Sequence, residues 1–401
     1  MNPGKAFRTL LLYRIGATLS YQISMVAVGW HLYEITNSVV SLGLIGLAEL
    51  VPYFALALYS GHAVDHYSRK WIAAIACLIH IAVGLFLTCI ALGWLSPPVP
   101  LIYAAVAFIG VGRALLRPSY QALFGHIIPR DQLPRYTAYA SSAFQICVVA
   151  GPGLGGLMIG FAGLEWTYLL AAFCGAVGLY GITFITAVQE KSSNLSGQFL
   201  KSFLEGFHYV RKHELILSIM ALDMFAVLFG GAVSILPAFV KEVLNAGPET
   251  LGILRAAPAA GAVITGIYLA RRPILTDSGK HLLISVAGFG AAIIAFGVSS
   301  NLWLCALFLF ISGCFDAVSV VIRGSIMQLT TPDHMRGRIS AINGIFIGSS
   351  NELGALESGI AASMMGLVPS IVFGGVATIA IVLITHRLAP HLSKLHLKDI
   401  S

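Results

Sequence analysis

The sequence has 401 residues, of which 57% are hydrophobic and only 10% are charged. Soluble globular proteins carry roughly 25% charged residues, so we expect a membrane protein whose apolar side chains face lipid. The net charge of +7 does not indicate nucleic-acid binding, because the Lys and Arg residues form short clusters between long apolar runs, as they do in the loops of membrane proteins.

Runs of roughly 20 apolar residues recur along the chain, and each is long enough to cross a bilayer as a helix. The first run follows the weakly basic segment Met1–Arg8, has no small-residue cleavage site and is expected to remain as the first span. We therefore predict an all-α membrane protein of about twelve transmembrane helices. The predicted spans are 10–33, 39–61, 71–93, 100–124, 137–161, 166–188, 215–239, 250–271, 281–299, 302–326, 338–363 and 367–387.

The longest polar break divides these spans into two halves. We expect an N-terminal six-helix bundle over 1–188, a linker over 189–213 and a C-terminal six-helix bundle over 214–401. Apolar residues recur at helical spacing between Leu200 and Val210 in the linker, which predicts an amphipathic helix on the cytoplasmic membrane surface; a flexible tether is the alternative.

Positive charge is distributed unevenly between the segments that join the spans. With both termini in the cytoplasm, eighteen Lys and Arg residues fall on the cytoplasmic side, Lys241 alone falls on the other side, and five lie within spans. Such an asymmetry predicts the orientation and favours an even number of spans. We expect a multi-pass protein of a cell membrane, most naturally a bacterial inner membrane.

The two halves repeat each other weakly. Residues 129–138 align with residues 332–341 at an offset of 203. Parallel six-span repeats imply two bundles around a central cavity, with a binding site near the bilayer midplane.

A conformational motif is predicted between the second and third spans, in Gly61-His62-Ala63-Val64-Asp65-His66-Tyr67-Ser68-Arg69-Lys70. Its Gly61, Asp65, Arg69 and Lys70 resemble the core of the signature loop of the major facilitator superfamily. A carboxylate at Asp65 could cap a helix and pair with a cation when the cytoplasmic side closes. A plain basic loop is the alternative.

A second motif lies in the predicted fifth span. Gly151, Pro152, Gly155 and Gly156 match the GPxxGG core that exporters of that superfamily carry in this span. Glycines at helical spacing let another helix approach closely, and proline bends the helix. The motif favours export over uptake, and ordinary small-residue packing is the alternative.

Further stretches, among them Trp30–Ser38, 202–207 and Arg336-Gly337-Arg338, resemble the enterobactin-exporter-like branch of the superfamily, which also holds macrolide and multidrug exporters. The resemblance covers nearly the whole chain. It implies a major facilitator fold and proton-driven efflux, and it does not supply the cargo.

Ionisable residues inside the spans are expected to carry function, because a charge in hydrocarbon costs several kcal/mol unless it is paired or hydrated. Arg113 aligns with Asp316 at the repeat offset, so pairing across the cavity is expected. Arg14, Arg117 and Arg323 are instead expected near the cytoplasmic ends, where they can reach the interface. For each residue a structural ion pair is the alternative. The predicted proton-coupling and cavity residues are Asp316, Asp223, Glu352, Arg113, Arg255 and Glu49.

The sequence lacks the motifs of an enzyme: it has no GxxxxGK[ST], no GxSxG and no HExxH. Six cysteines without CxxC spacing predict neither disulfides nor a metal site, and no cofactor is expected. We expect a proton-coupled exporter of a small amphipathic or siderophore-like molecule, working by alternating access and functional as a monomer. Uptake of a metabolite by a symporter or uniporter, and lipid flipping, are the alternatives.

Overall fold

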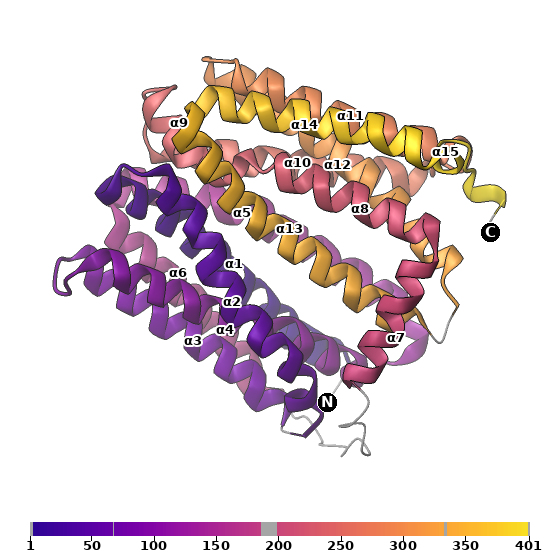
Figure 1. Ribbon diagram of the computed structural model, residues 1–401. Helices are drawn as coiled ribbons and strands as arrows, with labels where there is room; N and C mark the ends of the chain where they lie inside the picture. Colours follow the sequence, from indigo (N-terminus) through magenta and orange to yellow (C-terminus); the bar gives the residue numbers. More distant parts are fainter. Residues whose placement is uncertain (1–2, 67, 186–198, 333–334, 400–401) are drawn as a thin grey trace. The chain divides into compact units, whose positions relative to one another are not determined.

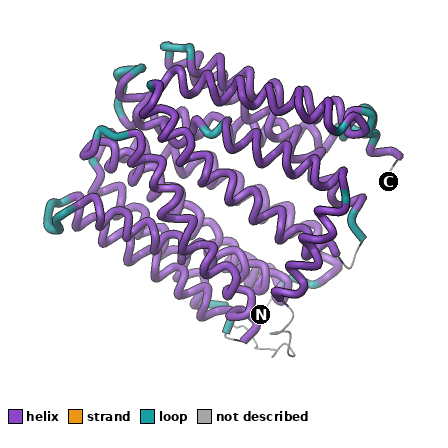
Figure 2. Tube along the Cα trace, in the orientation of Figure 1, coloured by secondary structure: helices purple, strands orange, loops and turns teal. Residues whose placement is uncertain are grey.

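The computed structural model describes residues 3–66, 68–185, 199–332 and 335–399, and every regular element in these ranges is a helix (Figures 1 and 2). The first half contains α1 (Pro3–Thr36), α2 (Val39–His66), α3 (Arg69–Ala91), α4 (Pro98–Ile127), the short η1 (Arg130–Gln132), α5 (Leu133–Ala162) and α6 (Leu164–Thr183).

The second half contains α7 (Phe199–Lys212), α8 (Glu214–Phe229), η2 (Ala232–Ile235), α9 (Leu236–Glu242), α10 (Pro248–Arg271), α11 (Ser278–Gly297), α12 (Leu302–Thr330), α13 (Arg336–Met365), α14 (Leu367–Leu388), α15 (Pro390–Ser393) and η4 (Leu397–Asp399). The predicted seventh span, 215–239, is broken in the structure: α8 ends at Phe229, and Gly230 and Gly231 precede η2.

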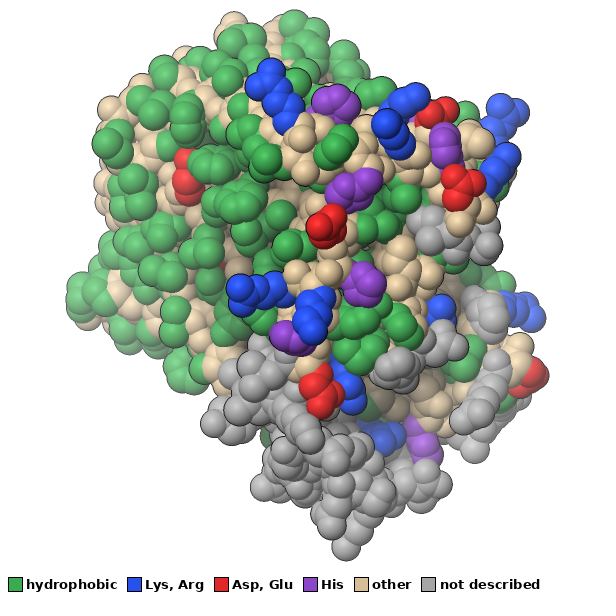
Figure 3. Space-filling model, turned by 45° about the vertical axis from the view of Figure 1, so that its right-hand side comes forward, with side chains coloured by type: hydrophobic (Ala, Val, Ile, Leu, Met, Phe, Trp, Pro, Cys, Tyr) green, Lys and Arg blue, Asp and Glu red, His purple; other side chains and the backbone are tan. Residues whose placement is uncertain are grey.

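Ten helical segments of the described chain are long and apolar enough to cross a membrane, with Glu214–Glu242 taken as one segment. The other two long helices, α1 and α13, also pack into the bundles but fall below this hydropathy, because each carries several charged and polar residues. The predicted all-α membrane fold is confirmed. Hydrophobic side chains cover most of the left-hand side of the surface seen in Figure 3.

The chain forms two compact units. The first takes its described residues from 1–41, 45–193 and 245–256, and the second from 42–44, 194–244 and 257–401. The first turns of α10 therefore group with the N-terminal helices. The boundaries at 188 and 213 stay a prediction.

In the first unit α1 packs against α4, α5 and α6, and α3 packs against α4 and α6. Buried side chains from four of these helices, including Leu10, Cys77, Leu123 and Ile182, fill the space between them. Helix α1 is therefore held on several sides, which fixes the residues along it that face a cavity described below.

In the second unit α11 packs against α12 and α14, and α8 packs against α13 and α14. The segment predicted to be amphipathic is helical, as α7. Its Val210 is buried in the core of this unit, and Glu205 forms an ion pair of 2.7 Å with Arg338 of α13. The location of α7 on a membrane surface stays a prediction.

The C-terminal segment folds back onto the turn before α11. The Asp277 amide donates to Nδ1 of His396 at 2.8 Å, the Gly279 amide donates to the Leu395 carbonyl at 3.1 Å, and the Leu397 amide donates to the Ser278 hydroxyl at 3.3 Å. A Cβ on Gly279 would overlap the Leu392 carbonyl, so only glycine permits this close approach.

Candidate functional site

The first unit contains a cavity of about 560 Å³ between helices α1, α2, α4 and α5. Cavities of this size hold drug-sized ligands. The lining consists of Tyr13, Arg14, Ala17, Thr18, Tyr21, Gln22, Tyr53, Arg113, Leu116, Arg117, Tyr120, Gln121, Phe144 and Val148.

Arg14 of α1 lies between two aromatic rings of this lining. Its guanidinium carbon is 4.3 Å from the centroid of Tyr120 and 4.9 Å from that of Phe144. Both separations are within the range of cation–π attraction. Arg14 is therefore held by ring faces on α4 and α5, and the expectation that it reaches the membrane interface stays a prediction.

Arg113 of α4 is a second arginine of the cavity lining, and it is ion-paired. Its Nη1 lies 2.6 Å from Oε1 of Glu49 on α2, and the Tyr21 hydroxyl donates to the same oxygen at 3.0 Å. Glu49 is 1% exposed, and its Oε2 has no hydrogen-bond partner in the described structure. The guanidinium also lies 5.4 Å and 5.2 Å from the rings of Tyr21 and Tyr53.

This arrangement places a buried carboxylate directly beside the cavity wall. An ion pair in a low-dielectric interior stabilises the ionised acid, whereas loss of the Arg partner favours the protonated form. The ion pair thus links the cavity lining, through Arg113, to a buried acid on α2.

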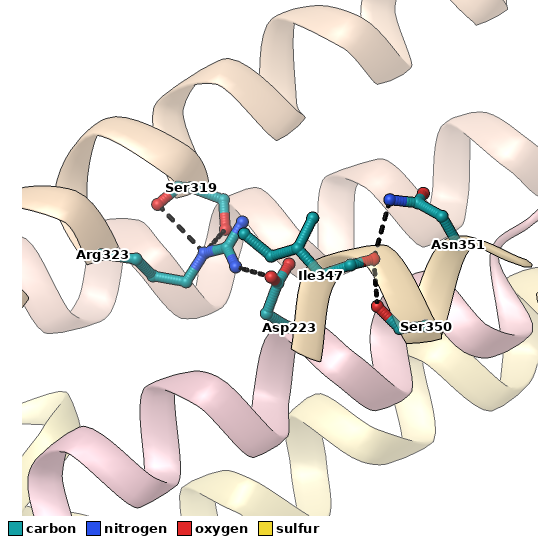
Figure 4. A network of polar contacts seen from close by, with 6 residues as sticks. All are labelled: Asp223, Ser319, Arg323, Ile347, Ser350 and Asn351. Atoms are coloured by element: carbon teal, nitrogen blue, oxygen red, sulfur yellow. Dashed lines mark hydrogen bonds and ion pairs between the residues drawn. The ribbon is translucent and has the colours of Figure 1, made fainter. Parts of the chain in front are cut away.

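The second unit holds another buried ion pair, between Asp223 of α8 and Arg323 of α12 (Figure 4). Both side chains are 9% exposed. Nε of Arg323 also donates to the Ser319 hydroxyl at 3.1 Å and to the Ser319 carbonyl at 3.3 Å. The expectation that Arg323 reaches the membrane interface is therefore wrong, because its charge is neutralised inside the helix bundle.

The other predicted cavity residues occupy different surroundings. Asp316 of α12 is half-buried, and no ion pair or hydrogen bond reaches it from the described residues. Glu352 of α13 is half-buried. Arg255 of α10 groups with the first unit, close enough to Tyr21 to interact electrostatically, and its buried Nε has no hydrogen-bond partner in the described chain. Because Arg113 is paired with Glu49, its pairing with Asp316 stays a prediction.

The loop motif is divided between two helices. Gly61 and Asp65 lie in the last turns of α2, and their side chains lie outside the described part of the structure. Arg69 donates to the Ala122 carbonyl at 3.4 Å, and Lys70 donates to the Thr183 carbonyl at 2.7 Å. Both cations thus approach the C-terminal ends of helices α4 and α6, where the helix dipole favours positive charge. The role of Asp65 stays a prediction.

The glycine motif lies in the interior of α5 and faces two neighbours. A Cβ on Gly156 would lie 2.6 Å from the backbone of Gly252 in the first turns of α10, whereas one on Gly151 would lie 2.6 Å from Cβ of Gln22 on α1. Gly155 is less tightly packed, since a Cβ added there would lie 3.4 Å from Cβ of Val26. Pro152 lies in the same helix, and its carbonyl approaches Gly252.

Sequence reasoning missed the aromatic lining of the cavity. A signal was present: Arg113, Arg117, Tyr120 and Gln121 recur at spacings that place them on one face of a helix. The same holds for Arg14, Thr18 and Tyr21 on α1. Their proximity across helices depends on packing, which helical spacing does not supply.

The apolar helices and the ion pairs buried among them indicate a polytopic membrane protein. The model for a family described as transmembrane secretion effectors matches residues 3–399. The chain therefore belongs to that family of the major facilitator superfamily, whose members are transporters and not enzymes.

Two similar proteins are efflux proteins. The macrolide efflux protein A of Streptococcus pyogenes is 21% identical over 388 residues, covering 94% of each chain. The enterobactin exporter EntS of Escherichia coli O9:H4 (strain HS) is 24% identical over 392 residues, covering 95% of this chain and 93% of the exporter.

Solved transporter structures share the fold. A bacterial homologue of the human lysosomal transporter Spinster, in an inward-facing and unoccupied conformation, gives a TM-score of 0.75 at 16% identity and covers 99% of this chain and 98% of its own. A D-xylose-proton symporter gives a TM-score of 0.74 at 11% identity, covering 97% of this chain and 99% of its own. At these identities the likeness concerns the fold alone.

Proposed function

We propose that this transporter exports a small amphipathic molecule in exchange for protons, with the cavity of the first unit as part of its cargo site. The observation that carries the proposal is the position of Glu49, a buried carboxylate whose partner, Arg113, lines the cavity. A cargo that engages Arg113 weakens its hold on Glu49, and a proton can then replace the guanidinium as the carboxylate's partner.

The second unit supplies further candidates for proton binding. Asp316, Asp223 and Glu352 stay in the proposed set, with Asp316 ranked first because no ion-pair partner in the described chain neutralises it. Asp223 requires that its pair with Arg323 be broken before it can take a proton. The proposed proton-binding acids thus lie in both units, and for Glu49 and Asp223 an Arg residue competes with the proton.

Export rather than uptake is supported by two relatives named for efflux and by the glycine motif of α5. The charge asymmetry supports an orientation with both termini in the cytoplasm of a bacterial cell, in its inner membrane. Alternating access by rocking of two six-helix bundles is the movement that parallel repeats permit. We expect a monomer to suffice, because each unit has its own core.

The test uses proteoliposomes that contain a pH-sensitive dye. Enterobactin and a macrolide, the cargoes for which relatives are named, are added with and without an imposed pH gradient. When the gradient is present, the wild type should accumulate one of these cargoes inside the liposomes. Protons should leave the liposomes in exchange, which the dye reports. Glu49→Gln, which keeps the side-chain shape, should abolish gradient-driven accumulation and retain passive exchange.

A matched control replaces an exposed acid of the second unit that is absent from the cavity lining, Glu214→Gln at the start of α8, and should transport normally. Gradient-driven accumulation by Glu49→Gln at the wild-type rate would remove this carboxylate from the mechanism. Movement of cargo down its own gradient in the wild type, without proton movement, would favour the uniporter alternative. Movement of labelled phospholipid in place of either cargo would favour a flippase.

A further inference from the structure

The cavity of the first unit is unevenly charged. Three arginines, Arg14, Arg113 and Arg117, contribute to its lining, whereas no aspartate or glutamate among the described residues does. Glu49 approaches from behind the wall and compensates Arg113 alone. No carboxylate of the described structure lies within ion-pair distance of Arg14 or Arg117. The cavity therefore carries an excess of positive charge.

The walls that hold these charges are aromatic. Rings of Tyr120 and Phe144 flank Arg14, and rings of Tyr21 and Tyr53 flank Arg113. A guanidinium packed on ring faces keeps its N–H edges directed outward, where they can bind a planar anion through two parallel hydrogen bonds. Ring faces that are not covered by a guanidinium can pack against an aromatic ligand in offset or edge-to-face geometry.

The two arginines without an acidic partner come from different helices. Arg14 is on α1 and half-buried, whereas Arg117 is on α4, one turn beyond Arg113 and on the same face, and is more exposed. An anion in the cavity would therefore meet positive charge from two sides. A cation would be repelled by both arginines and would find no free acidic side chain on the wall.

We infer that the cargo bound in this cavity is an aromatic anion, in which a carboxylate or another acidic group is held by Arg14 and Arg117 and the ring packs against Tyr120 and Phe144. The inference rests on the proposed function, because it takes the cavity to be the cargo site. It also specifies that function further, since neutral and cationic amphiphiles of the same size should bind more weakly.

Binding is measured on the purified full-length protein in nanodiscs without any gradient, by thermal stabilisation and by titration calorimetry. The probes are 2-naphthoate, 2-naphthylmethylamine and cyclohexanecarboxylate. The second probe replaces the negative charge with a positive one, and the third replaces the aromatic rings with a saturated ring. Because a ligand of the folded state alone raises its apparent stability, 2-naphthoate should raise the melting temperature at about 1 mM. Each of the other two probes should bind at least about tenfold more weakly.

Variants then assign the contacts. Arg14→Gln and Arg117→Gln should each weaken 2-naphthoate binding by about tenfold, and Arg117→Lys should recover part of the loss because it restores charge without the planar fork. Phe144→Leu should weaken 2-naphthoate more than cyclohexanecarboxylate. Arg271→Gln, at the exposed C-terminal end of α10 and absent from the lining, is the matched control and should bind like the wild type.

Equal or tighter binding of 2-naphthylmethylamine would overturn the inference, as would the absence of any shift with 2-naphthoate or unchanged binding in both arginine variants. These outcomes are independent of the transport assay. Selective 2-naphthoate binding in a protein that moves no protons would overturn proton-driven export while the cargo class stands. Proton-coupled movement of a macrolide without 2-naphthoate binding would overturn the cargo class while proton-driven export stands.

Discussion

Asp223 and Arg323 neutralise each other among buried side chains, so removing one charge leaves the other without compensation. Breaking a buried ion pair in this way costs about 3–5 kcal/mol. We therefore expect Asp223→Asn to lower the melting temperature of the purified transporter markedly, measured by differential scanning fluorimetry in detergent, in addition to its effect on transport.

The double variant Asp223→Leu/Arg323→Met separates the two effects. Replacing both charges with apolar groups of similar size is often neutral or stabilising, so stability should return while proton-driven transport stays lost. A double variant as unstable as Asp223→Asn would show that the destabilisation comes from packing and not from the uncompensated guanidinium.

Asp316 provides the contrasting case on the same helix. Since no described residue pairs with it, Asp316→Asn should leave the melting temperature close to that of the wild type. If Asp316 carries the transported proton, the variant should lose gradient-driven accumulation in proteoliposomes and keep passive exchange. Retained accumulation against a gradient would transfer this role to Glu49 or Asp223.

The approach of α5 to the first turns of α10 depends on the absence of side chains at Gly156 and Gly252. Both faces of the contact are backbone, which cannot swing aside as a side chain can. Gly156→Ala should therefore separate the helices and destabilise the protein by about 1–3 kcal/mol, the usual cost of overpacking, and transport should fall. Thermal unfolding and proteoliposome transport measure the two effects.

Gly153 serves as the control within the same helix, because a Cβ there would meet nothing within 4 Å. Gly153→Ala should be neutral or slightly stabilising, since alanine favours the helix. Equal behaviour of the two variants would refute the explanation by close contact.

The positions of the membrane helices along the chain could largely be predicted from the sequence. The side-chain contacts between those helices could not. Long apolar runs indicate membrane helices because every backbone polar group in lipid must be satisfied within its own helix. The break after Phe229 was not predicted, although Gly230 and Gly231 follow it, because the apolar run continues across them. The partners of Arg113 and Arg323 were missed because Glu49 and Asp223 lie far away in the sequence, and only helix packing brings each pair together.

At the scale of the whole molecule, the orientation in the membrane is open to a direct test. Single cysteines introduced at Ser193 and Lys398, in a background without the six native cysteines, should react with a membrane-impermeant maleimide only from the cytoplasm. A cysteine at Asn245 should react only from outside. Labelling of Ser193 and Asn245 from the same side would contradict the predicted number of spans and the orientation drawn from the charge asymmetry.

The folded-back C-terminal segment has a practical consequence for handling the protein. Residues 395–397 exchange hydrogen bonds with Asp277, Ser278 and Gly279, so the segment is part of the second unit and not a spare end. Shortening the chain at Ala389 to aid crystallisation would remove the hydrogen-bond partners of the Asp277 amide, the Gly279 amide and the Ser278 hydroxyl. An affinity tag should follow Ser401 through a flexible spacer, so that the tag does not disturb the hydrogen bond between His396 and Asp277.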